Sequence, residues 1–525
     1  MKKIFSFLKN NLVVLLLFLS WLIVTIPNLN IYWMLVDDGG DVVFARTLFE
    51  KLISFNIIGF VSQLLEAGGR FRPVYWIYHM LVWVVGRNSY QFHHFAHMVV
   101  IGITVYFIYL IIKELTNSKL TSFFASLTYL LIPLNSENIF RLGPQEPLLT
   151  MFFSILIYLI IKNKKNFLPC LILVLAVFTK ETSVALLPVL FFYYFYGKRS
   201  KIVQNKKQGY YLWITVCISS VVLILITFLR RGGYSTNYLF DIQMFIANLS
   251  FYFVELSKNT LFVFPLAIIV YLLRLGTSII KKQKILNSKR DIFEFLFLLT
   301  FLCLFLIQIP WKYAIDRYLL PADLFLIIFS FIEVYIDFEL LSKYKFISSH
   351  KSIFSFLLIF IGLFTALIWG IEIVSREIAN VSYYQAFYKM STLPKNTVIL
   401  VNMPEGENTI EYQYEIEIQL SEFWNRNDLK VQFLDLQNLP KDNYVIIDSD
   451  QLSRTYQMSE LNHKFGTPKT TLINSSENII ITTPFQFIKL CAEKIIKSLL
   501  YKKRFDFEGI YTYSYNHNNW YFFNE

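Results

Sequence analysis

The chain has 525 residues, of which 55% are apolar and only 16% are charged. An average soluble domain carries about 25% charged residues, and a soluble globule of this size could not remove so much apolar surface from water. The composition therefore excludes an ordinary cytosolic enzyme and a disordered chain, and it indicates a polytopic membrane protein. The net charge of +12 is typical of basic cytoplasmic loops in such a protein and does not indicate nucleic-acid binding.

Apolar segments predict eleven transmembrane helices in the first 372 residues. The first segment extends from Leu12 to Pro27 after a basic N-terminus. It resembles a signal peptide, but no small-residue cleavage site follows, so we expect an uncleaved first span. The other segments approach the ~20 residues needed to cross a bilayer. They are 94–112, 120–134, 147–161, 167–179, 183–196, 210–229, 259–273, 292–309, 318–336 and 353–372.

The charges of the loops predict the orientation of these spans. If the N-terminus is cytoplasmic, every inner loop is rich in Lys or Arg, as the positive-inside rule requires. The apolar stretch 73–86 must then not cross, because a crossing would turn all the later basic loops outward. We expect this stretch to form a helix in the outer leaflet, and we expect the C-terminus to lie outside. The basic inner loops are those near 113–119, 162–165, 198–207, 281–290 and 343–351.

The composition changes after Trp369, which predicts a second domain. Short apolar runs at 397–401, 431–436, 444–448 and 479–483 are typical of strands. The segments 409–424 and 486–503 have the apolar spacing of helices. The chain therefore divides into a transmembrane module, 1–374, and a small extracytoplasmic α/β domain, 375–525.

The first candidate for chemistry is the sequence DDGGD at residues 37–41, just after the first span. Asp37 and Asp38 repel each other, and such repulsion raises the pKa of one carboxylate toward the range of a general base. The glycines allow a sharp turn or the close approach of a ligand. A solvated loop is the alternative, because Asp and Gly are common in turns. Adjacent carboxylates also suit a divalent cation, although nothing in the sequence requires one.

Two further outer segments contain charges of both signs. In the segment 133–147, Glu137 and Arg141 are four residues apart and would pair on a helix; an ordinary polar loop is the alternative. In the segment 178–188, Lys180 and Glu181 interrupt two apolar runs. A phosphate at the interface would suit Lys180, with Glu181 to orient it. A snorkelling lysine with a local ion pair is the alternative.

Arginines supply two more candidate phosphate ligands. Arg317 lies at the start of the span 318–336, and Arg231 lies on another outer loop. A guanidinium can hold two phosphate oxygens at once, but either arginine would also serve as the anchor of a helix end.

Four histidines raise the question of a metal site. His93 and His97 are four residues apart, which places two ligands on one helix face. No third ligand follows at a convincing spacing, so we expect polar packing of these side chains and no metal site.

The order of these segments resembles that of the GT-C superfamily of polytopic glycosyltransferases. Acidic residues in the first outer loop are followed by FRPVYWIYHMLVWVVG and YQFHHFAH, which are similar to a Pro-bearing helix and the next span of that superfamily. SENIFRLGPQEPLL and FTKETSVALLP resemble segments of the protein O-mannosyltransferases, although this chain has no tetratricopeptide repeats. The resemblance covers about residues 12–196 and extends more loosely to 330.

The resemblance implies a membrane glycosyltransferase that needs no cofactor. A sugar would move, with inversion, from a polyprenyl-phosphate donor to a hydroxyl of a glycan, lipid or protein acceptor on the non-cytoplasmic face. Asp38 or Asp37 would be the base. Charge on the leaving phosphate would be stabilised by Lys180, Arg317 and Arg231. The groups that bind sugar or acceptor, or orient the site, would be Glu137, Glu181 and Arg141.

Two other functions remain open for such a chain. A lipid or glycolipid transporter, or flippase, would bind a head group without breaking a bond, and it would need functional charges at mid-membrane or on both sides. A scaffold is the third reading, although eleven spans exceed what anchoring needs. Heavy use of Lys, Ile, Asn and Phe is typical of an AT-rich genome and favours a bacterial plasma membrane.

Overall fold

The computed structural model describes seventeen stretches of the chain, and the statements below concern these residues. They are 2–33, 38–66, 71–132, 135–164, 167–199, 206–229, 242–259, 263–280, 288–310, 316–341, 383–405, 407–441, 443–449, 454–472, 475–481, 511–517 and 520–524.

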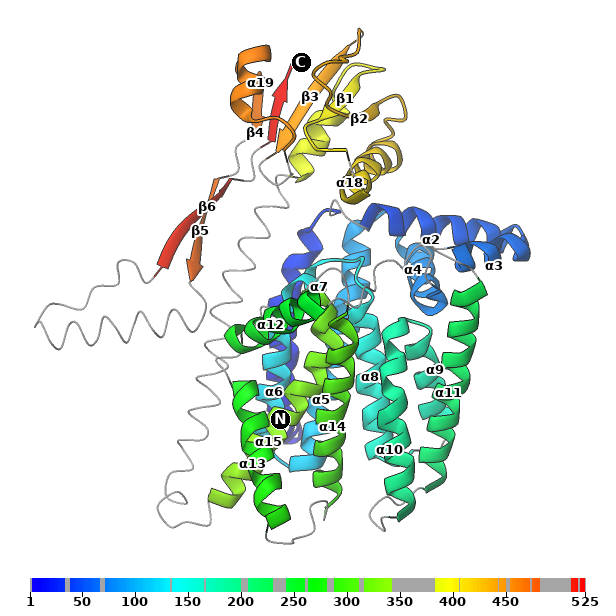
Figure 1. Ribbon diagram of the computed structural model, residues 1–525, viewed down its shortest axis with the longest axis vertical. Coiled ribbons are helices and arrows are strands. Elements are labelled where there is room, and N and C mark those ends of the chain that lie inside the picture. Colours follow the sequence, from blue (N-terminus) through cyan, green and yellow to red (C-terminus); the bar gives the residue numbers. More distant parts are fainter. Residues whose placement is uncertain are drawn as a thin grey trace, which may run out of the picture.

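A bundle of long apolar helices forms the larger part of the molecule (Figure 1). Each of the first ten expected spans coincides with a helix, and the eleventh, 353–372, lies outside the described residues. Six helical segments are long and apolar enough to cross a membrane, so the count of eleven stays a prediction. The ten helices are α1 (Lys2–Thr25), α5 (Tyr90–Thr116), α6 (Lys119–Leu131), α8 (Glu146–Ile161), α9 (Phe167–Val177), α10 (Leu186–Arg199), α11 (Lys206–Leu229), α13 (Val263–Ile280), α14 (Lys289–Gln308) and α15 (Leu320–Leu341).

Shorter helices cover one end of this bundle. In Figure 1, α2 (Asp38–Ile53), α3 (Ile57–Glu66) and α4 (Pro73–Gly86) lie across the upper ends of the long helices. The helix expected at 73–86 is present as α4, and its 14 residues span only ~21 Å of a ~30 Å hydrocarbon core. The loop reading of DDGGD is wrong, because residues 38–41 form the first turn of α2. The sequence also did not predict α12 (Ile242–Asn259).

Contacts between charged groups gather at the opposite end of the bundle. The Lys162 Nζ lies 2.5 Å from Glu114 Oε2, and the Lys289 ammonium donates to the Ile161 carbonyl at 2.7 Å. These residues belong to three of the expected inner loops or their borders. The described parts of these three loops therefore share one end of the molecule, as the positive-inside rule requires.

The C-terminal part contains a five-stranded sheet with the order β2-β1-β3-β7-β4. The strands β1 (Val398–Val401), β2 (Lys430–Phe433) and β3 (Tyr444–Ser449) are parallel. The strand β7 (Trp520–Phe523) is antiparallel to β3 and to β4 (Thr470–Leu472).

Helices accompany this sheet, and most of the expected elements are found. The helix α18 (Glu407–Ile418) continues as the π-helical turn η7 (Gln419–Phe423), and α19 is Met458–Phe465. The strand expected at 479–483 occurs as β5 (Ser475–Ile481), but it pairs with β6 (Tyr511–His517) in a separate hairpin. The helix expected at 486–503 and the boundary expected at 374/375 lie outside the described residues.

One apolar core joins the sheet domain to the helices below it. Trp33, Val42 and Trp83 from the N-terminal part belong to the same buried cluster as Leu420 and Trp520 from the C-terminal part. A shared core of this kind fixes the two parts against each other, since burial of apolar surface is lost if they separate.

Candidate functional site

The N-terminus of α2 carries the predicted base. Asp38 is the first residue of the helix and is fully buried, and its Oδ1 accepts a hydrogen bond from the Gly143 backbone N–H at 3.1 Å. The unpaired N–H groups at a helix N-terminus favour a carboxylate in this position. Asp37 lies outside the described residues.

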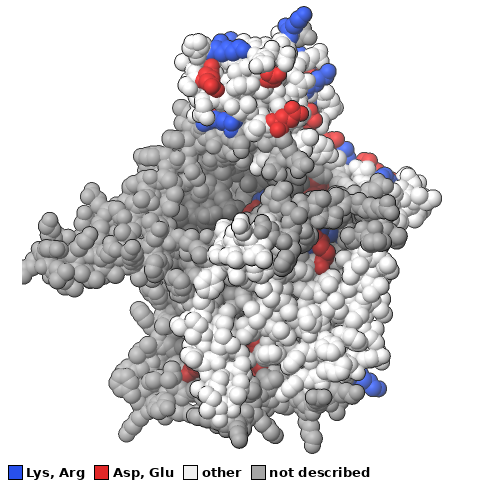
Figure 2. All heavy atoms as spheres, in the orientation of Figure 1, with Lys and Arg blue, Asp and Glu red and all other residues white. Residues whose placement is uncertain are grey.

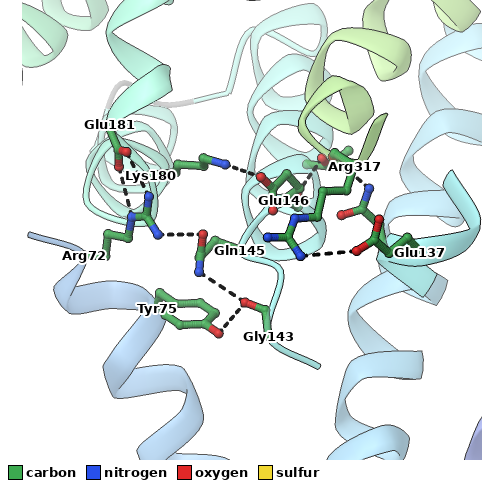
Figure 3. Close-up of polar contacts among 11 residues, drawn as sticks. Arg72, Tyr75, Glu137, Gly143, Gln145, Glu146, Lys180, Glu181 and Arg317 are labelled. Carbon is green, nitrogen blue, oxygen red and sulfur yellow. Dashed lines mark hydrogen bonds and ion pairs between the residues drawn. The ribbon is translucent and has the colours of Figure 1, made fainter. Parts of the chain in front are cut away.

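A ladder of hydrogen bonds leads from α2 to the start of α4, and Figure 3 shows its part from Tyr75 to Arg72. The Tyr75 hydroxyl contacts the Asp41 carboxylate and lies 2.7 Å from the Gly143 carbonyl. The Gln145 amide donates to the same carbonyl at 3.1 Å and accepts from Arg72 Nη1 at 2.7 Å. The ladder thus connects Asp41, the third carboxylate of the DDGGD sequence, to a buried arginine.

That arginine has a carboxylate partner on a distant segment. Arg72 Nε and Nη2 donate to the two oxygens of Glu181 at 3.0 and 2.8 Å. Burial alone would lower the pKa of Arg72, but the carboxylates of Glu181 and Glu146 raise it above its ordinary value. The local ion pair between Lys180 and Glu181, which the alternative of a snorkelling lysine required, is therefore wrong. Glu181 begins the turn η4 (Glu181–Ala185), and its side chain points to α4 instead.

Lys180 forms an ion pair with Glu146, the first residue of α8. Both side chains are buried, with exposed fractions of 3% and 1%, so the snorkelling reading of Lys180 is also wrong. Burial lowers the pKa of Lys180 to about 8, against the opposing effect of Glu146. The ammonium also lies 4.4 Å from the centre of the Tyr318 ring, which is close enough for a cation–π contact.

A second ion-pair group lies beside this one. The expected pair of Glu137 and Arg141 is confirmed, with 2.5 Å between Oε1 and Nη1. Arg317 joins it, with its Nη1 at 3.2 Å from the same oxygen of Glu137. Asn138 donates to the Arg317 carbonyl at 2.8 Å, which ties the helical turn η6 (Asp316–Leu319) to the short helix α7 (Ser136–Phe140).

The structure thus brings six of the eight predicted site residues to one end of the bundle. They are Asp38, Glu137, Arg141, Lys180, Glu181 and Arg317. Asp37 and Arg231 lie outside the described residues.

The sequence did not assign roles to four residues that connect these groups. They are Arg72, Tyr75, Gln145 and Glu146. The signals that point to them are a charge before the helix-starting Pro73 and a carboxylate at the first residue of an apolar helix.

Charges of both signs are concentrated at this end. In the described ion-pair groups, four cations (Arg72, Arg141, Lys180 and Arg317) contact three carboxylates (Glu137, Glu146 and Glu181), and the carboxylates of Asp38 and Asp41 are buried at the same end. Charges held beside apolar helices mark a polar site.

The histidines contribute to packing in the described structure. The His93 ring nitrogen Nε2 lies 2.9 Å from the Arg87 carbonyl, and that of His97 lies 2.8 Å from the Asn138 carbonyl. His97 thereby contacts the helix that carries Glu137. Within the described stretches, no three His, Cys, Asp or Glu side chains are grouped as a metal would need.

A narrow apolar cavity lies inside the bundle, between α8, α10, α14 and α15. Its volume is about 50 Å³. Its lining on α8 starts at Phe153, seven residues after Glu146 and so ~10 Å along the helix. On the chain after Lys180, the lining starts at Leu186. The cavity therefore lies about two helical turns from the buried ion pair.

Comparison with known proteins shows one likeness in structure and none in sequence. No family model matches the chain, and no curated protein matches it. Among solved structures, one that is similar to the chain is ArnT from Cupriavidus metallidurans bound to undecaprenyl phosphate. The two are 10% identical, the match covers 89% of this chain and 96% of that chain, and the TM-score is 0.46. A likeness at this identity and TM-score carries no argument about activity, which must come from the side chains of the chain itself.

Proposed function

We propose that the chain is an integral membrane glycosyltransferase that moves a sugar from a polyprenyl-phosphate donor to an acceptor hydroxyl. The site would face the non-cytoplasmic side, because it lies at the end of the bundle opposite the basic contacts and the positive-inside rule assigns basic loops to the cytoplasm. This function is inferred from the position of the ion-pair groups at the ends of apolar helices.

The observation that carries the proposal is a group of buried cations at the ends of apolar helices. A lipid phosphate has a charged head and a long apolar tail, so a protein that binds one needs a charged site that continues into an apolar environment. Glu146 begins α8 and Lys180 lies just before η4 and α10, and the apolar lining between these helices starts about two helical turns further along. The cations of the ion-pair groups would attract the phosphate.

The proposed reaction is a single displacement at the anomeric carbon. The acceptor oxygen forms a bond to that carbon while the bond from the carbon to the phosphate oxygen breaks, and the configuration inverts. Asp38 takes the proton of the acceptor hydroxyl, and the polyprenyl phosphate leaves with the electron pair. Because Asp38 is buried against Gly143, we expect the acceptor to displace part of this contact when it binds.

Cations would lower the barrier by stabilising the leaving phosphate. Arg317 and Arg141 both contact the carboxylate of Glu137, and a guanidinium can hold two phosphate oxygens at once. Lys180 and Arg317 lie 4.4 and 5.4 Å from the centre of the Tyr318 ring, so their charges are close to each other. Such fixed charges act most strongly where the developing charge is shielded from water.

One observation favours the alternative of a lipid transporter. Arg274 Nη2 lies 2.6 Å from a carboxylate oxygen of Glu294 and 2.6 Å from one of Glu333. Both glutamates are fully buried in α14 and α15, toward the end with the basic loops. Charges near both ends of the bundle are what a transporter would need, and the sequence analysis did not detect this group.

A reconstituted assay separates the two functions. Purified protein in liposomes would be given a short-chain polyprenyl-phosphate sugar and a range of hydroxyl acceptors. Formation of a glycosylated acceptor together with free polyprenyl phosphate would support the transferase. Movement of a labelled lipid across the bilayer with no bond broken would favour the transporter and would overturn the proposal.

A further inference from the structure

A carboxylate of the sheet domain caps the helix that carries Asp38. Glu415 lies on α18 and is 3% exposed. Its Oε2 accepts from the Gly39 N–H at 3.1 Å, and its Oε1 accepts from the Gly40 N–H at 2.9 Å. The first N–H groups of a helix have no partner within it, and a nearby side chain usually satisfies them. Here the partner is 376 residues away in the sequence.

The two glycines are what allow this approach. A Cβ on Gly39 would stand 2.6 Å from Glu415 Oε2, and a Cβ on Gly40 would stand 3.0 Å from Oε1. Gly is otherwise unfavourable within a helix. The close approach of Glu415 explains why two glycines occur in the first turn of α2. Any side chain at residue 39 must push the Glu415 carboxylate away.

Other contacts fix the position of Glu415 relative to α2. Arg46 and Glu422 form a two-bond ion pair, at 2.5 and 2.9 Å. The Trp424 indole N–H donates to the Tyr32 hydroxyl at 2.8 Å. In the chain, Tyr32 precedes the capped glycines and Arg46 follows them. The shared apolar core adds Val42 of α2 and Ile416 of α18 to these contacts. The carboxylate is therefore held by the sheet domain as a whole.

We infer that the sheet domain holds the first turn of α2 through Glu415 and so sets the position of Asp38. Asp38 directly precedes the capped glycines, and Asp41 directly follows them. Glu415 is thus a positioning residue for the candidate base and does not touch the reacting atoms. The consequence for sugar transfer depends on the proposed function, whereas the cap itself does not.

Hydrogen exchange tests the cap without any assay of activity. In Glu415→Gln, one side-chain oxygen remains to accept and an amide N–H group faces the other glycine, so one of the two bonds is lost. We expect amide exchange in the peptide 38–48 to become about tenfold faster, the effect of losing a helix cap on local opening. The control is Glu417→Gln, a change of the same kind two residues away on α18, which should leave the exchange unchanged.

A double-mutant cycle tests the positioning. Gly39→Ala should lower the turnover number about tenfold or more, since a small displacement of a catalytic group has such effects, and should leave the donor KM unchanged. Glu415→Ala should act similarly. In Gly39→Ala/Glu415→Ala the added methyl group occupies the space of the lost carboxylate, so the double variant should be no slower than either single variant.

The outcomes separate the inference from the proposed function. Unchanged exchange in Glu415→Gln would overturn the cap, and additive effects in the cycle would overturn the positioning role. If wild-type protein transfers no sugar, the proposed function fails while the exchange experiment still decides the inference. Should Glu415→Ala fail to fold, the exchange and turnover of Glu415→Gln against Glu417→Gln decide it.

Discussion

The buried pair of Lys180 and Glu146 has two roles that mutation can separate. Both side chains are almost fully buried and contact each other. Removal of one partner leaves an uncompensated charge, which costs ~3–5 kcal/mol of stability, whereas removal of both charges is often nearly neutral. A loss of activity in a single variant therefore does not reveal whether Lys180 also binds phosphate.

A double variant resolves this ambiguity at Lys180. We expect Lys180→Gln to lower the melting temperature and Lys180→Gln/Glu146→Gln to restore most of it. Turnover per folded protein at saturating donor should stay low in both, because the attraction to the leaving phosphate is lost in both. Recovery of turnover together with stability would show that Lys180 serves the fold alone. Arg317→Gln should also lower turnover, and its effect should be non-additive with that of Lys180→Gln.

Asp38 provides a second test at the scale of one residue. Asp38→Asn keeps an oxygen that accepts from the Gly143 N–H, so the contact at 3.1 Å and the fold should survive. The amide cannot accept a proton at neutral pH, and transfer should fall ~10²–10⁴-fold, the usual contribution of a general base. Turnover and melting temperature would be measured on the same preparation. Activity within a few-fold of wild type would place the base elsewhere.

Sequence reasoning at this scale succeeded where partners are close in the chain. The pair of Glu137 and Arg141 follows from helical spacing and is present. The pair of Lys180 with Glu146 was not predicted, because Glu146 approaches Lys180 only when α8 and η4 are packed together. Glu415 could not be found at all, since no local pattern connects it to residues 39 and 40.

At the scale of elements, the long apolar helices were predictable because hydropathy is a local property. The ten expected spans coincide with helices, and the parallel strands β1, β2 and β3 also lie where apolar runs indicated them. The helix α2 was not expected, because two glycines and two aspartates in its first turn are typical of a loop. The contact with α18 supplies what the local sequence lacks.

The contact between α2 and the turn η7 should depend on pH. The hydrogen bond from Arg46 lowers the pKa of Glu422 in the folded chain. The contact therefore contributes stability above the ordinary glutamate pKa of about 4.3, and this contribution is lost as the pH falls through the lowered pKa of the folded state. Wild type should melt higher than Glu422→Gln at neutral pH, and the difference should shrink below about pH 4.

Thermal melts between pH 7 and pH 3.5 would measure this difference. Glu417→Gln is the control and should follow wild type throughout. High salt should also reduce the difference, because both side chains are about 29% exposed and screening acts on such pairs. A difference in melting temperature that does not change with pH would mean that the ion pair of Arg46 and Glu422 does not stabilise the contact between α2 and the sheet domain.

At the scale of the molecule, charge is distributed unevenly along the long axis. On the face drawn in Figure 2, Lys, Arg, Asp and Glu gather on the sheet domain and where it meets the bundle, while the described bundle surface below is mostly uncharged. The lower end carries charges again, where Lys162, Lys289 and Arg290 meet their partners. A neutral belt between two charged ends is the pattern expected of a protein that crosses a bilayer.

This distribution predicts on which side of the membrane each end lies. Glu415 contacts Gly39 and Gly40, so the sheet domain and the candidate base must share one side. Lys162, Lys289 and Arg290 lie at the other end, which the positive-inside rule assigns to the cytoplasm. Ser459 is exposed on the sheet domain and Lys164 is exposed at the basic end.

Ser459→Cys and Lys164→Cys would be made in a chain whose four native cysteines are replaced by alanine. A membrane-impermeant maleimide should label Ser459→Cys in intact cells and should label Lys164→Cys only after the membrane is opened. If only Lys164→Cys is labelled in intact cells, the protein has the opposite orientation in the membrane. The candidate site would then face the cytoplasm, and a donor presented on the outer face could not reach Asp38.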